Sequence, residues 1–271
     1  MRRVAFVLLL AATPVAAQDS VPAPAAVPVA VPAPAPAPSY PFAVGERFDY
    51  QVKLGIFSIG RARLQVVQQD TLGGRDVFML QMTINGRALF FTLDDTLTSW
   101  TGVRDFHSYR FRQTNNEDGK YRKWDYFIHP DSGYYRKYSQ MDTTYTTVAD
   151  PLDDVAFLYW VRTLPLEVGQ SYTWDRYFKP DKNPVRVRVL KRQNCELPHD
   201  EKRKCLLIQP SIRSSGLLGE AADARILITD DVDRIPVEVR SNFSFGTLVL
   251  KLRGVTRGGP PAPATPPVGT P

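Results

Sequence analysis

The sequence has few of the residues on which disulfide scaffolds and metal sites depend. It contains 2 cysteines and 3 histidines among 271 residues, which excludes a disulfide-dense miniprotein. Its 17 glycines show no triplet period, so a collagen-like chain is excluded as well. Long apolar runs are also missing, apart from one at the extreme N-terminus. Membrane proteins with several spans are therefore excluded, and a globular protein with one sizeable core remains.

Residues 1–17 have the pattern of a secretory signal peptide. Arg2 and Arg3 supply the positive charge, an apolar stretch too short to span a bilayer follows, and small residues precede a cleavage site near Ala17. A buried N-terminal helix is the alternative. Cleavage removes two positive charges, so the mature chain is only mildly basic. We therefore expect an exported protein, periplasmic or associated with the cell envelope, with no transmembrane span in the mature chain.

Two segments rich in proline flank the predicted domain. Residues 18–41 consist mostly of Pro, Ala and Val, and residues 258–271 have the same character. Such segments favour extended polyproline II and cannot build a core, so they predict a disordered linker and a disordered tail. A spacer that crosses the envelope or engages a partner is the alternative. Residues 42–257 remain as the ordered domain.

The domain alternates apolar and polar residues with a period of two, which is typical of antiparallel strands with one buried face. The clearest runs lie at residues 47–54, 61–66, 78–84, 124–128, 185–189, 226–228, 237–239 and 248–252. Short clusters at Gly73-Gly74, Asn85-Gly86, 115–119 and 131–133 predict the turns between them. The pattern predicts an all-β, mainly antiparallel fold, either a strongly curved sheet or a barrel-like sandwich.

Residues 153–164 depart from this alternation. Helical spacing relates four of their side chains, namely Val155, Leu158, Tyr159 and Arg162. Asp150 or Asp153 is suited to cap the start, and Pro165 ends the segment. We therefore predict one amphipathic α-helix that packs against the sheet and is placed to act as a lid.

Five stretches of the domain carry a resemblance to a known bacterial family. They are residues 42–50, 59–66 (IGRARLQV), 151–169 (PLDDVAFLYWVRTLPLEVG), 228–237 (ITDDVDRIPV) and 246–252 (GTLVLKL). Together they resemble the family catalogued as domain of unknown function 3108. The resemblance implies an exported envelope protein with a curved or barrel-like antiparallel sheet, similar in shape to lipoprotein carriers, and none of the five stretches is enzymatic. Residues 194–205 depart from the family pattern through a charged insertion.

Cys195 and Cys205 flank this charged insertion between two predicted strands. In an oxidising compartment the pair predicts a disulfide across a hairpin. Closing a loop of this size contributes about 2–3 kcal/mol in the chain-entropy model. Two free thiols are one alternative. A metal pair with His199 is the other, although it leaves a ligand missing.

No motif for catalysis, metal binding or cofactor binding occurs in the sequence. There is no Gly-x-Ser-x-Gly elbow and no glycine-rich phosphate loop before a helix. His107, His129 and His199 form no metal-type pair. The carboxylate clusters at residues 94–95, 150–154 and 230–233 are expected to cap helices and turns, with acid–base or calcium chemistry as the alternatives. We therefore predict no catalytic residue, no metal and no cofactor.

Arg162 lies among apolar residues of the predicted helix, where a charge is costly unless it is paired. Either it pairs with an acidic residue, or it lines a cavity with Tyr159 and Trp160 and binds an anionic ligand. Basic residues also follow the predicted strands, interleaved with aromatics near residues 120–138. A solvated sheet face explains this pattern, and so does a surface for lipid or anionic glycolipid. Export argues against nucleic acid.

These features favour a non-enzymatic envelope protein that binds an apolar or amphiphilic ligand or assists envelope assembly. A structural module that binds another envelope protein is the alternative, and an enzyme with a dispersed site is the third hypothesis. A ligand binder needs an open apolar cavity inside the sheet, whereas a structural module fills that space.

Overall fold

The computed structural model describes residues 38–259, except 89–90, 118, 214–215 and 245. These residues belong to the second of two compact units, residues 37–271. The predicted signal peptide, most of the predicted linker and residues 260–271 lie outside the described residues.

A single antiparallel sheet of 14 strands forms the fold, which confirms the predicted all-β class. The strands are β1 (Arg47–Leu54), β2 (Phe57–Leu72), β3 (Arg75–Ala88), β4 (Phe91–Gly102), β5 (Ser108–Glu117), β6 (Lys120–His129), β7 (Tyr134–Lys137), β8 (Gln140–Thr146), β9 (Ser171–Trp174), β10 (Val185–Glu196), β11 (Lys202–Ser211), β12 (Arg225–Thr229), β13 (Pro236–Phe243) and β14 (Gly246–Thr256). One α-helix, α1 (Asp154–Trp160), lies between β8 and β9. Five short 3-10 helices complete the described elements: η1 (Pro130–Ser132), η2 (Val161–Thr163), η3 (Pro180–Lys182), η4 (Pro198–Asp200) and η5 (Glu220–Ala222).

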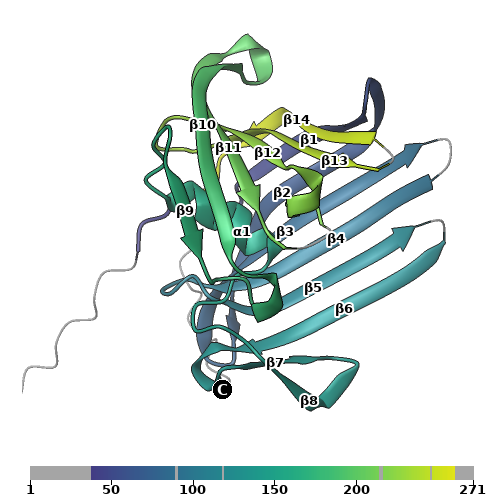
Figure 1. Cartoon of the computed structure of the whole chain (residues 1–271), viewed down its shortest axis with the longest axis vertical. Helices are drawn as coiled ribbons and strands as arrows, with labels where there is room; N and C mark the ends of the chain where they lie inside the picture. The colour runs from purple at the N-terminus through teal and green to yellow at the C-terminus, as the bar shows by residue number, and fades with distance from the viewer. Residues whose placement is uncertain (1–37, 89–90, 118, 214–215, 245, 260–271) are drawn as a thin grey trace, which may run out of the picture. The chain divides into compact units, whose positions relative to one another are not determined.

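The sheet is two meanders joined at the centre by the first and last strands. Strands β1 to β8 each pair with the next strand in sequence, and so do β9 to β14. β1 then pairs with β14, from Arg47 opposite Thr256 to Leu54 opposite Leu248. β8 and β9 form the two ends of the ladder, and no strand pairing among the described residues joins them. The strongly curved sheet therefore has two edges (Figure 1).

Helix α1 lies inside this curve, between the two meanders (Figure 1). It packs against β3 and β4, and its Trp160 contacts Trp174 of β9. Every residue from Val155 to Trp160 is buried. The helix is therefore apolar on all sides and not amphipathic as predicted, because the sheet covers it from opposite directions. Among the described residues, no helix combines the length and apolar composition needed to cross a bilayer.

Side-chain packing and one isolated parallel bridge, between Leu152 and Tyr177, connect the segments that follow β8 and β9. Phe178, in the segment between β9 and β10, is fully buried and packs against the rings of Phe111, Tyr126 and Tyr135 from β5, β6 and β7. The hydroxyl of Thr147, just after β8, donates to the carbonyl of Phe178 at 2.7 Å. These contacts hold the second meander against the first.

Two sequence predictions about local structure were wrong. Asn85-Gly86 lies within β3 and forms no turn, and Asp94-Asp95 lies inside β4 and not at a strand end. Gly86 sits opposite Gly60 of β2, where a Cβ on Gly60 would lie only 1.9 Å from the carbonyl oxygen of Asn85. The glycines therefore allow two strands to approach closely, which a sequence pattern cannot distinguish from a turn.

We expect Gly60→Ala to lower the free energy of unfolding by about 3 kcal/mol, because the new methyl group would overlap the backbone of β3. Gly259→Ala is the matched control, since an added Cβ there meets no atom within 4 Å. Urea unfolding of both variants tests the close approach, and equal stability of the two would contradict it.

Candidate functional site

Asp153 attaches the start of α1 to the sheet. Its Oδ1 accepts hydrogen bonds from the backbone N–H groups of Val155 and Ala156, both at 2.9 Å, as an N-cap does. The hydroxyl of Ser99 on β4 donates to Oδ2 at 2.5 Å, and the Asp153 backbone N–H donates to the hydroxyl of Ser108 on β5 at 2.9 Å. The predicted capping role of this carboxylate is therefore confirmed. Burial raises the pKa of Asp153 to about 6.

Arg162 follows α1, in η2, and its side chain is fully buried. Its Nη1 and Nη2 donate to the two carboxylate oxygens of Glu46 at 2.6 and 2.9 Å. Its remaining hydrogen bonds go to the backbone carbonyls of Pro41, Asp233 and Arg234. Arg162 thus forms the internal ion pair that was one of its two predicted alternatives. The pair connects the helix to the start of the domain and to the loop before β13.

Aromatic rings surround this guanidinium. The rings of Phe42, Phe48 and Tyr159 lie 5.4, 5.1 and 5.4 Å from the guanidinium carbon. Such contacts favour a cation that has been removed from water. Burial raises the pKa of the Glu46 carboxyl, and the hydrogen bonds from Arg162 oppose that rise.

Tyr159 and Trp160, the other two predicted ligand-binding residues, lie beside Arg162 in the packed interior. Tyr159 is fully buried, and its hydroxyl has no hydrogen-bond partner among the residues that the structure describes. Trp160 packs edge-on against Trp174 at 4.5 Å, and the guanidinium of Arg176 covers it at 4.8 Å. A surface hollow of about 450 Å³ borders Arg162 near residues 39–41 and 231–234, but the Arg162 side chain is not exposed in it. A ligand at these three residues stays a prediction.

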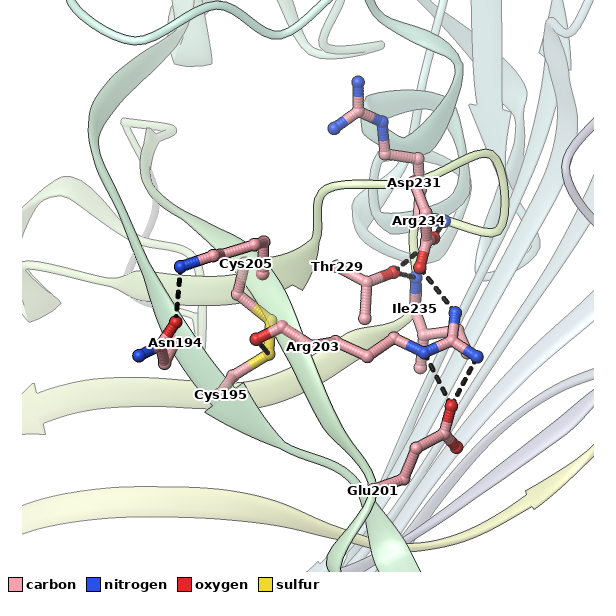
Figure 2. The surroundings of a disulfide bond; sticks show 10 residues. Asn194, Cys195, Glu201, Arg203, Cys205, Thr229, Asp231, Arg234 and Ile235 are labelled. Atoms are coloured by element: carbon pink, nitrogen blue, oxygen red, sulfur yellow. Dashed lines mark hydrogen bonds and ion pairs between the residues drawn. A yellow bond between two sulfur atoms is a disulfide. The ribbon is translucent and has the colours of Figure 1, made fainter.

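The loop at residues 230–235 binds Arg162 through two backbone carbonyls and also contacts the hairpin of β10 and β11. Figure 2 shows its contact with the hairpin. Oδ1 of Asp231 accepts from the Thr229 hydroxyl at 2.7 Å and from the Asp233 and Arg234 backbone N–H groups at 3.0 and 3.2 Å. Its other oxygen accepts from Arg203 of β11 at 2.6 Å. The acidic cluster therefore shapes a turn, as predicted, and presents two carbonyls to Arg162.

Cys195 and Cys205 lie on this same hairpin, with their sulfur atoms 1.98 Å apart, the distance of a disulfide bond (Figure 2). Cys205 is fully buried and Cys195 nearly so. The charged insertion between them forms the tip of the hairpin and includes η4. The structure thus has the predicted disulfide across the hairpin.

The three histidines lie in three different segments of the chain. His107 has its Nε2 at 3.1 Å from Asp150, His129 ends β6, and His199 lies at the tip of the β10–β11 hairpin. Within the described part of the chain, no three His, Cys, Asp or Glu side chains gather where a metal ion could bind.

The sequence places this fold in a family. The family model described as "Protein of unknown function (DUF3108)" matches residues 49–253. The chain belongs to this family. The match spans β1 to β14 and includes α1 and the disulfide hairpin of the DUF3108 domain. No curated protein matches the sequence.

A solved structure has a similar fold. It is the crystal structure of a beta-barrel-like protein of domain of unknown function DUF1849 from Brucella abortus. The similarity has a TM-score of 0.51 and 13% sequence identity, and covers 80% of this chain and 98% of that chain. At this identity the likeness concerns the fold alone.

We expect Arg162→Met to lower the free energy of unfolding of the DUF3108 domain by about 3–5 kcal/mol, because it leaves the buried Glu46 carboxylate without its charge partner. The double variant Arg162→Met/Glu46→Gln should recover part of this loss, since neither charge remains. Urea unfolding measures both effects. A single variant as stable as the wild type would show that the ion pair is dispensable.

The raised pKa of Asp153 predicts a pH dependence. Between about pH 4 and 6 the folded protein keeps a proton that the unfolded chain, with an ordinary pKa of 3.8, has released. The contribution of Asp153 to stability is therefore fully present below pH 4 and decreases as the pH rises to 6, by about 2–3 kcal/mol in total.

Asp153→Asn keeps a capping oxygen and removes the titration. The stability difference between wild type and variant, measured by urea unfolding from pH 4 to 7, should follow this decrease and become constant above pH 6. A difference that does not change with pH would contradict the assignment.

Proposed function

We propose that this DUF3108 protein is an exported, non-enzymatic module of the cell envelope that binds its partner through its outer surface and does not enclose a ligand inside the sheet. The observation that carries the proposal is the filled interior. Residues 155–160 of α1 occupy the space within the curve, and the buried pair of Arg162 and Glu46 completes it.

The filled interior favours an interaction module over a carrier. A carrier needs a concave apolar space that opens to its ligand. Here the helix that was expected to act as a lid is itself the core, fixed at its start by Asp153 and just beyond its end by Arg162. Opening the sheet would separate a buried ion pair, which is costly.

Export is supported by two independent features. Residues 1–17 have the pattern of a signal peptide, and Cys195 and Cys205 lie at disulfide distance. Disulfides persist in the periplasm and outside the cell and are rare in the cytosol.

A carrier of an apolar or amphiphilic ligand is the second candidate, and one observation favours it. The buried hydroxyl of Tyr159 has no hydrogen-bond partner among the described residues, although buried polar atoms are normally paired. This hydroxyl belongs to one of the three residues for which a ligand was predicted from the sequence.

Native mass spectrometry of residues 18–271, purified from a bacterial periplasm, distinguishes the two candidates. We expect the mass of the bare protein, with no gain on incubation with envelope phospholipids, because the interior is occupied. A discrete added mass that organic extraction identifies as lipid would overturn the proposal in favour of the carrier.

Two tyrosine variants refine this test. Under the proposal, Tyr159→Phe should be as stable as the wild type or slightly more so, because it removes an unpaired buried hydroxyl. Tyr50→Phe is the matched control and should lose about 1 kcal/mol, since the Tyr50 hydroxyl donates to the carbonyl of Pro236 at 2.9 Å. A lipid adduct that disappears only in Tyr159→Phe would assign the ligand to this hydroxyl.

A further inference from the structure

A groove of about 700 Å³ lies across β1, β2, β3 and β14 in the centre of the sheet. Its lining is Asp49, Tyr50, Gln51, Ser58, Gly60, Arg61, Ala62, Arg63, Thr83, Asn85 and Arg253. The groove opens on the outer face, because the inward-facing side chains of these strands, such as Phe48, Leu64 and Leu252, belong to the core. Figure 1 labels the four strands that line it.

Two local features shape this part of the sheet. The pairing of β1 with β2 shifts register between Val52 and Lys53, which marks a β-bulge. Gly60, which lies opposite Val52, carries no side chain. Gly60 lets β2 and β3 approach closely at this point, and the exposed side chains of Arg61 and Arg63 border the groove.

The charge of the groove is positive and only partly neutralised. Asp49 accepts hydrogen bonds from Arg47 and Arg63 at 2.9 and 2.8 Å, and Arg253 donates to the amide oxygen of Gln51 at 2.5 Å. Arg61 is exposed and forms no ion pair or side-chain hydrogen bond with any residue that the structure describes. In the lining of the groove, the one carboxylate, that of Asp49, thus stands against three guanidinium groups.

Arginines on the outer face of β5 are arranged differently. Arg110 and Arg112 both bind the carboxylate of Asp125, and both lie over the ring of Trp100, at 4.8 and 5.5 Å. Burial would raise the pKa of Asp125, but the hydrogen bonds from the two arginines hold it below its usual value. Arg110 and Arg112 thus share partners within the protein, whereas Arg61 is available to a partner outside it.

The polar lining of the groove indicates the chemistry of that partner. The Ser58 hydroxyl accepts from Gln51, and the Asn85 amide nitrogen donates to Asp94. The Ser58 O–H, the Thr83 hydroxyl and the Asn85 amide oxygen remain to pair with the hydroxyl groups of a sugar. Tyr50 contributes no phenol, because its hydroxyl is buried and bound to Pro236. A purely apolar ligand finds no matching surface, while guanidinium groups bind phosphate and carboxylate in fixed geometry.

We propose that this groove binds an anionic carbohydrate, with Arg61 contacting its phosphate or carboxylate. The inference rests on the proposed function, because it names the surface and the chemical class through which an outward-facing module would act. The carbohydrate belongs either to a free polysaccharide or to the headgroup of a glycolipid, and both present the same chemistry.

Isothermal titration calorimetry with tetragalacturonate as the anionic probe and maltotetraose as the neutral one tests the groove. We expect the wild type to bind only tetragalacturonate, and less tightly as salt is added. Arg61→Gln should weaken this binding about tenfold, the effect of one charge-assisted hydrogen bond. Arg122→Gln is the matched control, because Arg122 is an exposed arginine on β6, outside the groove, and it should bind as the wild type does.

Flotation with phosphatidylcholine vesicles identifies the source. Vesicles that also contain lipopolysaccharide should carry the wild type but not Arg61→Gln if a glycolipid is bound, whereas binding of tetragalacturonate alone assigns a free polysaccharide. Three results would overturn the inference. The wild type and Arg61→Gln bind equally well, or the wild type binds neither tetragalacturonate nor lipopolysaccharide. In the third, the wild type floats as well with phosphatidylglycerol vesicles, which lack carbohydrate, as with vesicles that contain lipopolysaccharide. A bare native mass together with any of these results refutes the groove alone. A lipid adduct that Arg61→Gln retains lies outside the groove and refutes the proposed function itself.

Discussion

A guanidinium group lies at the centre of this fold, and it is tolerated there because one carboxylate and three carbonyls converge on it. Arg162 reaches Glu46 before β1, Pro41 at the start of the domain, and the carbonyls of Asp233 and Arg234 before β13. A buried charge needs all of its partners in place, so the ion pair positions two distant segments, residues 41–46 and the 230–235 loop, around the end of α1. Apolar packing alone would leave their relative placement less specific.

The sheet has two open edges, so contacts in its interior set its curvature. Because β8 and β9 do not pair, the ladder itself does not fix how tightly the sheet curls. The curl depends on two contacts inside the sheet. Asp153, the cap of α1, is hydrogen-bonded to β4 and β5. Phe178 packs against aromatic rings of β5, β6 and β7. An interior held in this way is a core, and the recognition that we propose belongs to the outer face. There, Arg110 and Arg112 are neutralised by Asp125 while Arg61 is not.

The candidate site was partly predictable from the sequence. A charge on an apolar helix marked Arg162 as paired or functional, and the cysteine pair and the Asp153 cap followed from local spacing. Glu46 was not identified as the partner, since 116 residues separate it from Arg162 and no local pattern connects them. The groove was missed for the same reason, because its lining comes from four strands and its depth from a bulge that alternation does not reveal.

Local sequence patterns were enough to predict the β class, most strand positions, the helix and the turn chemistry of the 230–235 loop, because each depends on residues close together in the chain. Only the tertiary structure decided that Gly60 and Gly86 face each other across two strands, that α1 is covered on every side, and which carboxylate neutralises which arginine. Those outcomes depend on how far a 14-stranded sheet curls. Curl is the sum of many small twists and of contacts between distant strands, and no single segment of the chain encodes it.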